Sequence, residues 1–260
     1  MNILLTSGGT RVQVDRVRHL GNMSRGTFGA AIAFELSQCL GINDELNFLY
    51  AKGSRAPFTT TVNWAVSNAM EANALLTKGQ RSFRDLTCRY YEQNYTTLYN
   101  YLESMRSMCD TYEYDVVVLA AAVSDFVVAN YVDGKIRSKD ALNIKLKPAP
   151  KIISEIQTRQ PNAHLVGFKL LVNSDPKDLI QAAQQSIETN KCSLVIANDL
   201  SDIWPGQGHQ RLYLVGGPEY VAAGGTALSI LEKVEDDPGY LVRQAAQAIM
   251  RLGAHPKKAK

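Results

Sequence analysis

An unbroken apolar run over residues 116–123 constrains the fold of this chain more than any other stretch. Its length and its content of β-branched residues are typical of a strand that is buried on both faces, as the strands of a parallel sheet are. Similar runs over 164–171 and 193–197 predict two more such strands. Ser124 and Asp125 should then emerge at the carboxyl edge of the sheet, where open α/β sheets bind ligands.

Segments with helical periodicity alternate with these strands. Apolar side chains recur at helical spacing over residues 27–40, 176–187 and 240–252, and Asp175-Pro176 is a strong start signal for the second of these helices. Further helices are predicted over 65–76, over 91–105 and from Pro150 onward, and further strands at 2–6, 46–51, 59–62, 143–147 and 211–215. This alternation predicts a single domain over residues 1–260, a doubly wound, mostly parallel Rossmann-like α/β sheet with helices on both faces and a small flap or edge extension.

The composition fits such a domain and excludes several other classes. Hydrophobic residues make up 45% of the chain, enough for a sizeable core, and the net charge of +3 is poor evidence for nucleic-acid binding but suits a small anionic substrate. The cysteines show no paired spacing and the histidines no metal-binding spacing, so free thiols in a reducing compartment and no protein metal site are expected. Because a signal peptide and an apolar run of about 18 residues are both missing, we expect a cytoplasmic protein that binds neither membrane nor nucleic acid.

A glycine-rich turn follows the first predicted strand. Ser7-Gly8-Gly9-Thr10 leaves the strand as a first βα turn does in nucleotide-binding sheets, although it lacks the GxGxxG dinucleotide fingerprint. A long loop with Asp15, Arg18 and Asn22 leads from this turn to Ser24-Arg25-Gly26 at the head of a helix. Backbone amides over residues 24–29 could therefore bind an anion. The same glycines could instead serve only to pack the helix against the strand.

A carboxylate and a lysine are expected at the tip of the strand over residues 116–123. Lys135 lies ten residues after Asp125, in a polar, glycine-containing loop at about 126–147 that we predict to be mobile. Such a loop could bring a cation onto a ligand bound at Asp125, which suggests phosphate chemistry. From the residues alone, a solvated charge is the ordinary interpretation of Lys135 and a core side chain that of Phe168, and Asp125 could equally be a turn or cap residue.

Several motifs, in order along the chain, carry a family resemblance. SGGTRVQVDRVRHLGNMSRG near the start is followed by AAAVSDF, KIRSKD, LKPAPKII, VGFKLLVN and VIANDL. Together they make the chain resemble phosphopantothenate–cysteine ligase, most closely its free-standing bacterial form, from Thr6 to about Leu200. The resemblance implies that a nucleoside triphosphate, CTP in preference to ATP, activates the carboxylate of 4'-phosphopantothenate as an acyl nucleotide. Cysteine then displaces the nucleotide to give 4'-phosphopantothenoylcysteine, a step of coenzyme A synthesis.

The resemblance also implies roles for individual residues. Lys135 matches the family's loop lysine, which contacts the phosphates during activation, and Asn22 matches the asparagine that holds the acyl nucleotide for attack. The nucleotide pocket is implied at Ala120, Ala121, Asp125, Lys135, Pro150, Lys151, Ile152, Ile153 and Phe168, and the substrate site at Gly8, Gly9, Asn22, Ser24 and Gly26. Mg²⁺ is implied by the triphosphate and a homodimer by the family.

The sequence departs from the family at Ser24-Arg25, where a serine pair is usual, in the loop over 135–138, which is usually all lysine, and on the helix before the ANDL strand. Many relatives carry two lysines on the helix before the ANDL strand, where this chain has Gln185 and Thr189, so Lys169 or Lys191 would have to compensate. A non-catalytic nucleotide-binding relative is therefore an alternative. An NAD(P)-binding oxidoreductase of similar fold is a further alternative, disfavoured because GxGxxG and a suitably placed Tyr-x-x-x-Lys pair are missing.

Overall fold

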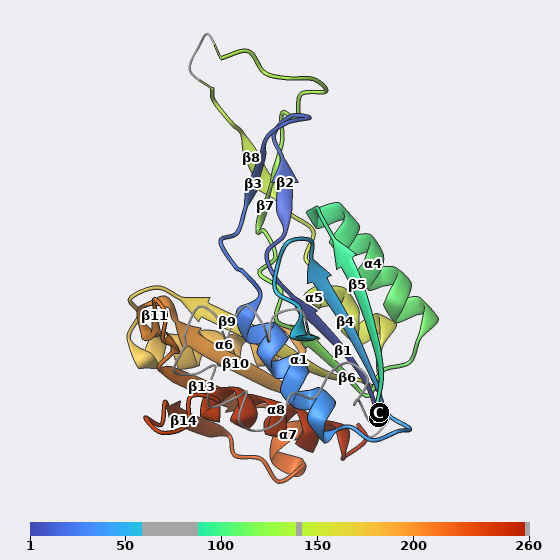
Figure 1. Ribbon diagram of the computed structural model, residues 1–260, viewed down its shortest axis with the longest axis vertical. Coiled ribbons are helices and arrows are strands. Elements are labelled where there is room, and N and C mark those ends of the chain that lie inside the picture. The colour runs from blue at the N-terminus through green and yellow to red at the C-terminus, as the bar shows by residue number, and fades with distance from the viewer. Residues whose placement is uncertain (59–87, 139–141, 258–260) are drawn as a thin grey trace.

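A mixed sheet of eight strands forms the centre of the molecule in the computed structural model, which describes residues 1–58, 88–138 and 142–257 (Figure 1). The strand order is β14-β13-β10-β9-β6-β1-β4-β5. The parallel strands are β1 (Asn2–Ser7), β4 (Glu45–Ala51), β5 (Arg89–Tyr95), β6 (Val116–Leu119), β9 (His164–Leu171) and β10 (Leu194–Asp199). The strands β13 (Arg211–Gly216) and β14 (Leu228–Glu232) add an antiparallel edge. The predicted fold class is confirmed.

Helices cover both faces of this sheet because its central strands are apolar on both sides. On one face, α4 (Leu98–Thr111), α5 (Ile153–Arg159) and α6 (Pro176–Asn190) share a core cluster with Leu4 and Val117. On the other face, α1 (Thr27–Cys39), α7 (Pro218–Ala222) and α8 (Tyr240–Gly253) share a second cluster with Ile3, Leu5 and Val116. Successive residues of one strand thus enter opposite cores, as the twofold repeat of a strand requires.

The strand order places a ligand crevice at the middle of the sheet. From β5 to β10 the order follows the Rossmann pattern, and its switch point lies between β1 and β6. The polypeptide segments that follow β1 and β6 diverge at the carboxyl edge of the sheet. The segments after β1 and after β6, which hold most of the predicted site residues, therefore begin at one place.

Two hairpins project from this edge as an arm (Figure 1). The first joins β2 (Arg11–Gln13) to β3 (His19–Gly21), and the second joins β7 (Phe126–Val128) to β8 (Leu146–Pro148). We call the described part of residues 11–21 and 126–148 the arm. The predicted flap is confirmed, although the strand expected at 143–147 begins later, and the stretch expected to be a long loop after β1 contains a hairpin.

Three predicted boundaries were wrong. The helix expected over 91–105 is instead strand β5 followed by α4, because the side chain of Thr97 accepts a hydrogen bond from the Asn100 amide and begins the helix there. The helix expected at Pro150 begins at Ile153. The strand expected over 116–123 ends at Leu119, and Ala122 continues the pairing only as an isolated parallel bridge to Gly9.

A short turn and a small hairpin follow β10. A 3-10 turn, η2 (Leu200–Asp202), leads from β10 into a small hairpin of β11 (Ile203–Trp204) and β12 (Gly208–His209). The strand and helix predicted at 59–62 and 65–76 lie outside the described residues. Within the described part of the chain, no helix combines the length and apolar character needed to cross a lipid bilayer.

Candidate functional site

The glycines around the turn after β1 are required by close packing. Gly8 and Gly26 have positive φ angles of 83° and 70°, which other residues rarely adopt. A Cβ on Gly26 would lie 2.9 Å from Ser7 Oγ, whose hydroxyl donates to the Gly26 carbonyl at 3.1 Å. A Cβ on Gly29 would also collide with Ser7. The packing explanation of these glycines is confirmed, and anion binding remains a separate prediction.

The head of α1 nevertheless has the chemistry of an anion site. Gly26 is its N-cap and supplies no side chain, so no side-chain oxygen caps the first turn of the helix. Uncapped amides at a helix N-terminus point outward and carry partial positive charge. Exposed Ser24 accepts a long hydrogen bond of 3.4 Å from the Gly26 amide. Because Gly26 packs against Gly8, these amides lie beside the turn after β1.

Asn22 is tied to the segment that follows β6. Its side-chain amide donates to the Ala122 carbonyl at 2.7 Å, and the Thr10 amide donates to the same oxygen at 3.1 Å. The Ala122 amide donates in turn to the Gly8 carbonyl at 2.8 Å. The amide group of Asn22 has two hydrogens, so one can hold it in place while the other is offered to a ligand.

The predicted pocket residues Ala120 and Ala121 lie directly before this contact and are half-buried. The Ala121 amide donates to Thr6 Oγ1 at 3.3 Å. Ala122, which joins the two segments, was missed because no side-chain signal distinguishes one alanine of the run from the next.

Asp125 lies where the arm joins the sheet. Its side chain is exposed, and its carbonyl accepts from the Ala149 amide at 2.9 Å, which brings the Pro150 segment beside it. Pro150 and Lys151 are exposed, whereas Ile152 is buried and Ile153 packs against the core. Only part of the predicted 150–153 segment is therefore presented to a ligand through side chains.

Phe168 belongs to an aromatic cluster at the head of α1. Its ring meets Phe28 edge-to-face with centroids 6.2 Å apart, and Phe28 lies 4.2 Å from the ring of His209. Burial lowers the pKa of His209 to about 4, so its imidazole is neutral at pH 7. His209 was missed because nothing in the sequence places the β11–β12 hairpin beside α1.

The loop of Lys135 is docked along residues 14–18. The Arg16 amide donates to the Gly134 carbonyl at 2.9 Å, and the Ile136 amide donates to Asp15 Oδ2 at 3.1 Å. Between them, Lys135 is exposed and makes no hydrogen bond or ion pair with the residues that the structure describes. Lys139 lies outside those residues, and the mobility of the loop remains a prediction.

Neither Gln185 nor Thr189 supplies a cation, as expected. The two exposed side chains bond each other on α6 at 3.0 Å. Lys191 follows the end of α6 and precedes β10, at the amino edge of the sheet and away from the crevice. Lys169 is near the carboxyl end of β9 and is the better placed of the two candidates to compensate.

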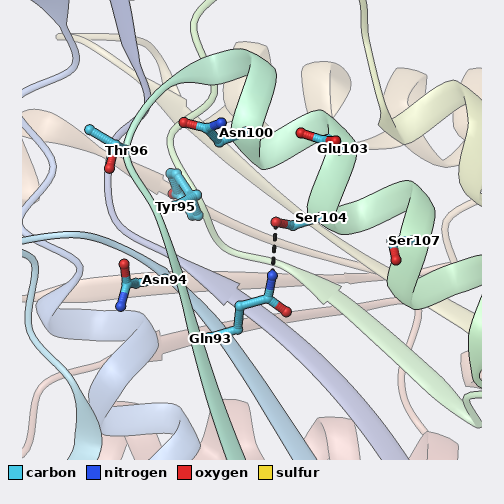
Figure 2. Close-up of a pocket in the computed structure, with 8 residues that line it drawn as sticks. All are labelled: Gln93, Asn94, Tyr95, Thr96, Asn100, Glu103, Ser104 and Ser107. Carbon is cyan, nitrogen blue, oxygen red and sulfur yellow. Dashed lines mark hydrogen bonds between the residues drawn. The ribbon is translucent and has the colours of Figure 1, made fainter.

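Two pockets of the described part of the chain lie outside the crevice. One, of about 340 Å³, opens between β5 and α4 and is lined by polar side chains, with Gln93 donating to Ser104 Oγ at 3.0 Å (Figure 2). Another, of about 270 Å³, lies between β2, β7 and the first turn of α4. Neither is lined by a predicted site residue.

Comparison with known proteins connects this geometry to a family. Residues 1–44 and 94–214 match the family described as DNA/pantothenate metabolism flavoprotein C-terminal domain. The coenzyme A biosynthesis bifunctional protein CoaBC of Thermococcus kodakarensis is 34% identical over 82% of this chain and 44% of that protein, and the one of Methanocaldococcus jannaschii is 27% identical over 93% and 51%. The chain thus spans about half the length of these relatives. The phosphopantothenate–cysteine ligase of Mus musculus is 30% identical over 77% of this chain and 73% of that protein.

Solved structures share the fold. The DNA/pantothenate metabolism flavoprotein from Streptococcus pneumoniae superposes with a TM-score of 0.66 at 24% identity, over 95% of this chain and 99% of that one. A mutant of Cab2 in complex with phosphopantothenate-cysteine gives 0.70 at 21% identity, over 98% and 88%. The overall fold therefore recurs in distant sequences.

Proposed function

Because the chain belongs to the DNA/pantothenate metabolism flavoprotein C-terminal domain family, we propose that it is a ligase that joins 4'-phosphopantothenate to cysteine in coenzyme A synthesis. One observation carries the proposal. The two stretches that match the family, 1–44 and 94–214, are the ones that meet at the crevice through Asn22 and Ala122 and that contain Lys135 and Phe168. The ligase of Mus musculus named among the relatives matches 77% of the chain.

The proposed reaction needs donors and cations aimed at oxygen atoms. The carboxylate of phosphopantothenate attacks the α-phosphorus of the nucleoside triphosphate, and the bond to pyrophosphate breaks. The amine of cysteine then attacks the acyl carbon, forms the amide and releases the nucleoside monophosphate. Both steps concentrate negative charge, which preorganised donors stabilise. Lys135 would meet the phosphates, Asn22 the acyl carbonyl, and the first turn of α1 a substrate phosphate.

CTP is proposed as the nucleotide, with ATP the second choice. Support comes from the resemblance to the free-standing bacterial form, which itself stays a prediction, and from the segment after Leu119, whose half-buried alanines bring main chain rather than polar side chains to the carboxyl edge. Buried hydrogen bonds to a base edge discriminate by roughly 1–3 kcal/mol each. Mg²⁺ would arrive on the triphosphate oxygens, since no cluster of three or more His, Cys, Asp or Glu side chains that could hold it occurs among the described residues.

The test is a reconstitution with purified protein, phosphopantothenate, cysteine, Mg²⁺ and either CTP or ATP. Release of pyrophosphate together with phosphopantothenoylcysteine, identified by mass, is the expected result, with higher kcat/KM for CTP. Equal or higher kcat/KM for ATP would remove the CTP assignment alone. Nucleotide binding without turnover would favour a non-catalytic relative, and a thermal shift with NADP but not CTP would favour an oxidoreductase.

A homodimer joined through the arm is proposed as the assembly. The arm exposes many large apolar side chains, which single chains seldom leave uncovered. They are Val17, Leu20, Phe126, Tyr131, Val132, Leu142 and Leu146. We propose a second copy of the chain as the partner, because the two-hairpin arm presents both apolar side chains and unpaired strand edges, which the same arm of another copy could cover.

Sedimentation equilibrium tests this assembly. Phe126→Lys should weaken the dimer by at least about tenfold, because it places a charge within an apolar contact. Tyr112→Lys is the matched control, since Tyr112 is 52% exposed against 54% for Phe126 and lies outside the arm. A wild-type monomer at all accessible concentrations, or equal effects of the two variants, would contradict the proposal.

A further inference from the structure

Asp15 is a fully buried carboxylate inside the arm. Its side chain is 0% exposed, and both oxygens are saturated with donors. Oδ1 accepts from the amides of Val17 at 2.7 Å and Arg18 at 2.6 Å. Oδ2 accepts from Arg18 Nη1 at 2.8 Å and from the Ile136 amide at 3.1 Å.

These contacts separate into two functions. The bonds to Oδ1 close a local turn of the kind that Asp and Asn form with amides two and three residues ahead. The bonds to Oδ2 cross to another part of the chain, because Ile136 is distant in sequence and directly follows Lys135. Arg18 reinforces the crossing, since its Nη1 also donates to the Ile136 carbonyl at 3.2 Å.

The same short segment leads to Asn22. Asp15 lies in the turn between β2 and β3, and β3 ends one residue before Asn22. The carboxylate therefore fixes the lysine loop on the hairpin that also presents the asparagine. Burial alone would raise the pKa of Asp15, but the hydrogen bonds from Val17, Ile136 and Arg18 outweigh it, and the pKa lies below its ordinary value.

We propose that Asp15 is a positioning residue that holds the Lys135 loop in register with Asn22. We call the bonds that join Asp15 Oδ2 and Arg18 to Ile136 the clasp. The clasp rests on these hydrogen bonds alone, whereas its catalytic consequence rests on the proposed ligase function. An exposed ion pair would not serve this purpose, because its geometry is loose and screened by water. A buried carboxylate with four directed donors defines one position.

Asp15→Asn separates the two functions of the carboxylate. An asparagine can keep its oxygen toward the amides of Val17 and Arg18 and so preserve the turn. Its NH₂ group then faces the Ile136 amide and the Arg18 guanidinium, which are donors as well, and the clasp opens. The matched control is Asp133→Asn in the Lys135 loop, which makes the same charge change but affects only the exposed pair with Arg16. Asp15→Ser is a second clasp variant, because serine can cap the turn but cannot reach Ile136.

Amide hydrogen exchange over residues 132–138 tests the clasp without any activity. We expect faster exchange in Asp15→Asn and Asp15→Ser and unchanged exchange in Asp133→Asn. Unchanged exchange in both clasp variants, or equal acceleration in the control, would overturn the clasp. If one variant does not fold, the other decides.

A double-mutant cycle tests the catalytic consequence. Asp15→Asn should lower the rate of acyl-nucleotide formation by roughly 10- to 100-fold, the scale of a misplaced catalytic group. In a Lys135→Gln background the same change should cost much less, because the lysine it positions is gone. Equal losses in both backgrounds would overturn positioning through Lys135. A wild-type protein that forms no product would refute the proposed function instead, and the exchange result would still decide the clasp.

Discussion

Lys135 is exposed on the surface of the arm and forms no hydrogen bond or ion pair with a described residue, so its charge is available to a ligand. We expect Lys135→Gln to lower kcat for acyl-nucleotide formation by roughly 10²- to 10³-fold, the usual loss for one preorganised donor. Ground-state affinity for the nucleotide should fall much less. Rapid quench and equilibrium binding measure the two quantities.

Arg137→Gln and Lys139→Gln are the controls for Lys135, at the same ionic strength. These residues carry the same charge on the same loop. Equal modest losses in all three variants, erased by added salt, would show that the loop acts as a diffuse basic surface and would remove Lys135 from the catalytic role.

Asn22 offers a different test because its amide already bonds the Ala122 carbonyl. Asn22→Asp removes the donors and sets a carboxylate against that carbonyl, so the variant cannot hold an acyl carbonyl for attack. We expect cysteine addition to slow more than activation, and acyl nucleotide to accumulate in a quench experiment with phosphopantothenate and CTP. Equal slowing of both half-reactions would contradict this role.

Residues were predictable from sequence where a polar side chain or glycine stood in a motif. Asn22 and Asp125 were placed near the carboxyl edge in this way, whereas Phe168, a side chain within β9, was predicted only through the family resemblance. Ala122 contributes through its backbone, and His209 through a packing contact between distant elements. Neither property leaves a pattern in the residue types, so neither contribution could be predicted from the sequence.

At the scale of elements, the junction of α1 with β1 depends on Gly26. Gly26→Ala should destabilise the protein by more than Gly208→Ala in urea unfolding. Both glycines have nearly the same φ, 70° and 71°, so both substitutions carry the left-handed strain of about 1–2 kcal/mol. A Cβ at Gly208 meets nothing within 4 Å, whereas one at Gly26 presses on Ser7 and on the Gly8 amide. Equal losses would show that packing at this junction is soft.

Element types followed from periodicity when the segment was long and buried. The bounds predicted for β9 and the start of α1 at Thr27 were correct. The tyrosines of β5 were misassigned to a helix because a spacing of four fits both the inner face of a helix and one face of a strand. Their partner strand β4, distant in the sequence, decided between them. The arm hairpins were too short to show any period.

At the scale of the whole molecule, His164 links β9 to the C-terminal segment. Its Nε2 donates to the His255 carbonyl at 2.8 Å, which leaves Nδ1 to accept from Ser193 Oγ at 3.0 Å. Burial is the largest cause that lowers its pKa. The unfolded chain, with a histidine pKa of about 6.5, then binds the proton more readily than the folded one. The free energy of unfolding should therefore fall as the pH drops below about 6.5.

Urea unfolding at pH 7.5 and 5.5 checks this dependence. His164→Gln should lose less stability over that interval than the wild type, because glutamine does not titrate. One proton contributes at most about 1.4 kcal/mol per pH unit. The pKa of His209 is also lowered, but His209 is present in both proteins, so its contribution to the pH dependence cancels in the comparison. Parallel losses in the two proteins would contradict the assignment to His164.

The short length of β6 has a consequence for how a base preference could change. Residues 120–123 carry apolar side chains, so any donor or acceptor that they offer to a base belongs to the main chain, and every amino acid but proline carries the same ones. A library that randomises these side chains would alter the shape of the surface that faces a base but would keep its main-chain hydrogen-bond donors and acceptors. New nucleotide preferences would come instead from insertions or deletions that reroute the chain between Leu119 and Asp125, a kind of variation that point mutation does not sample.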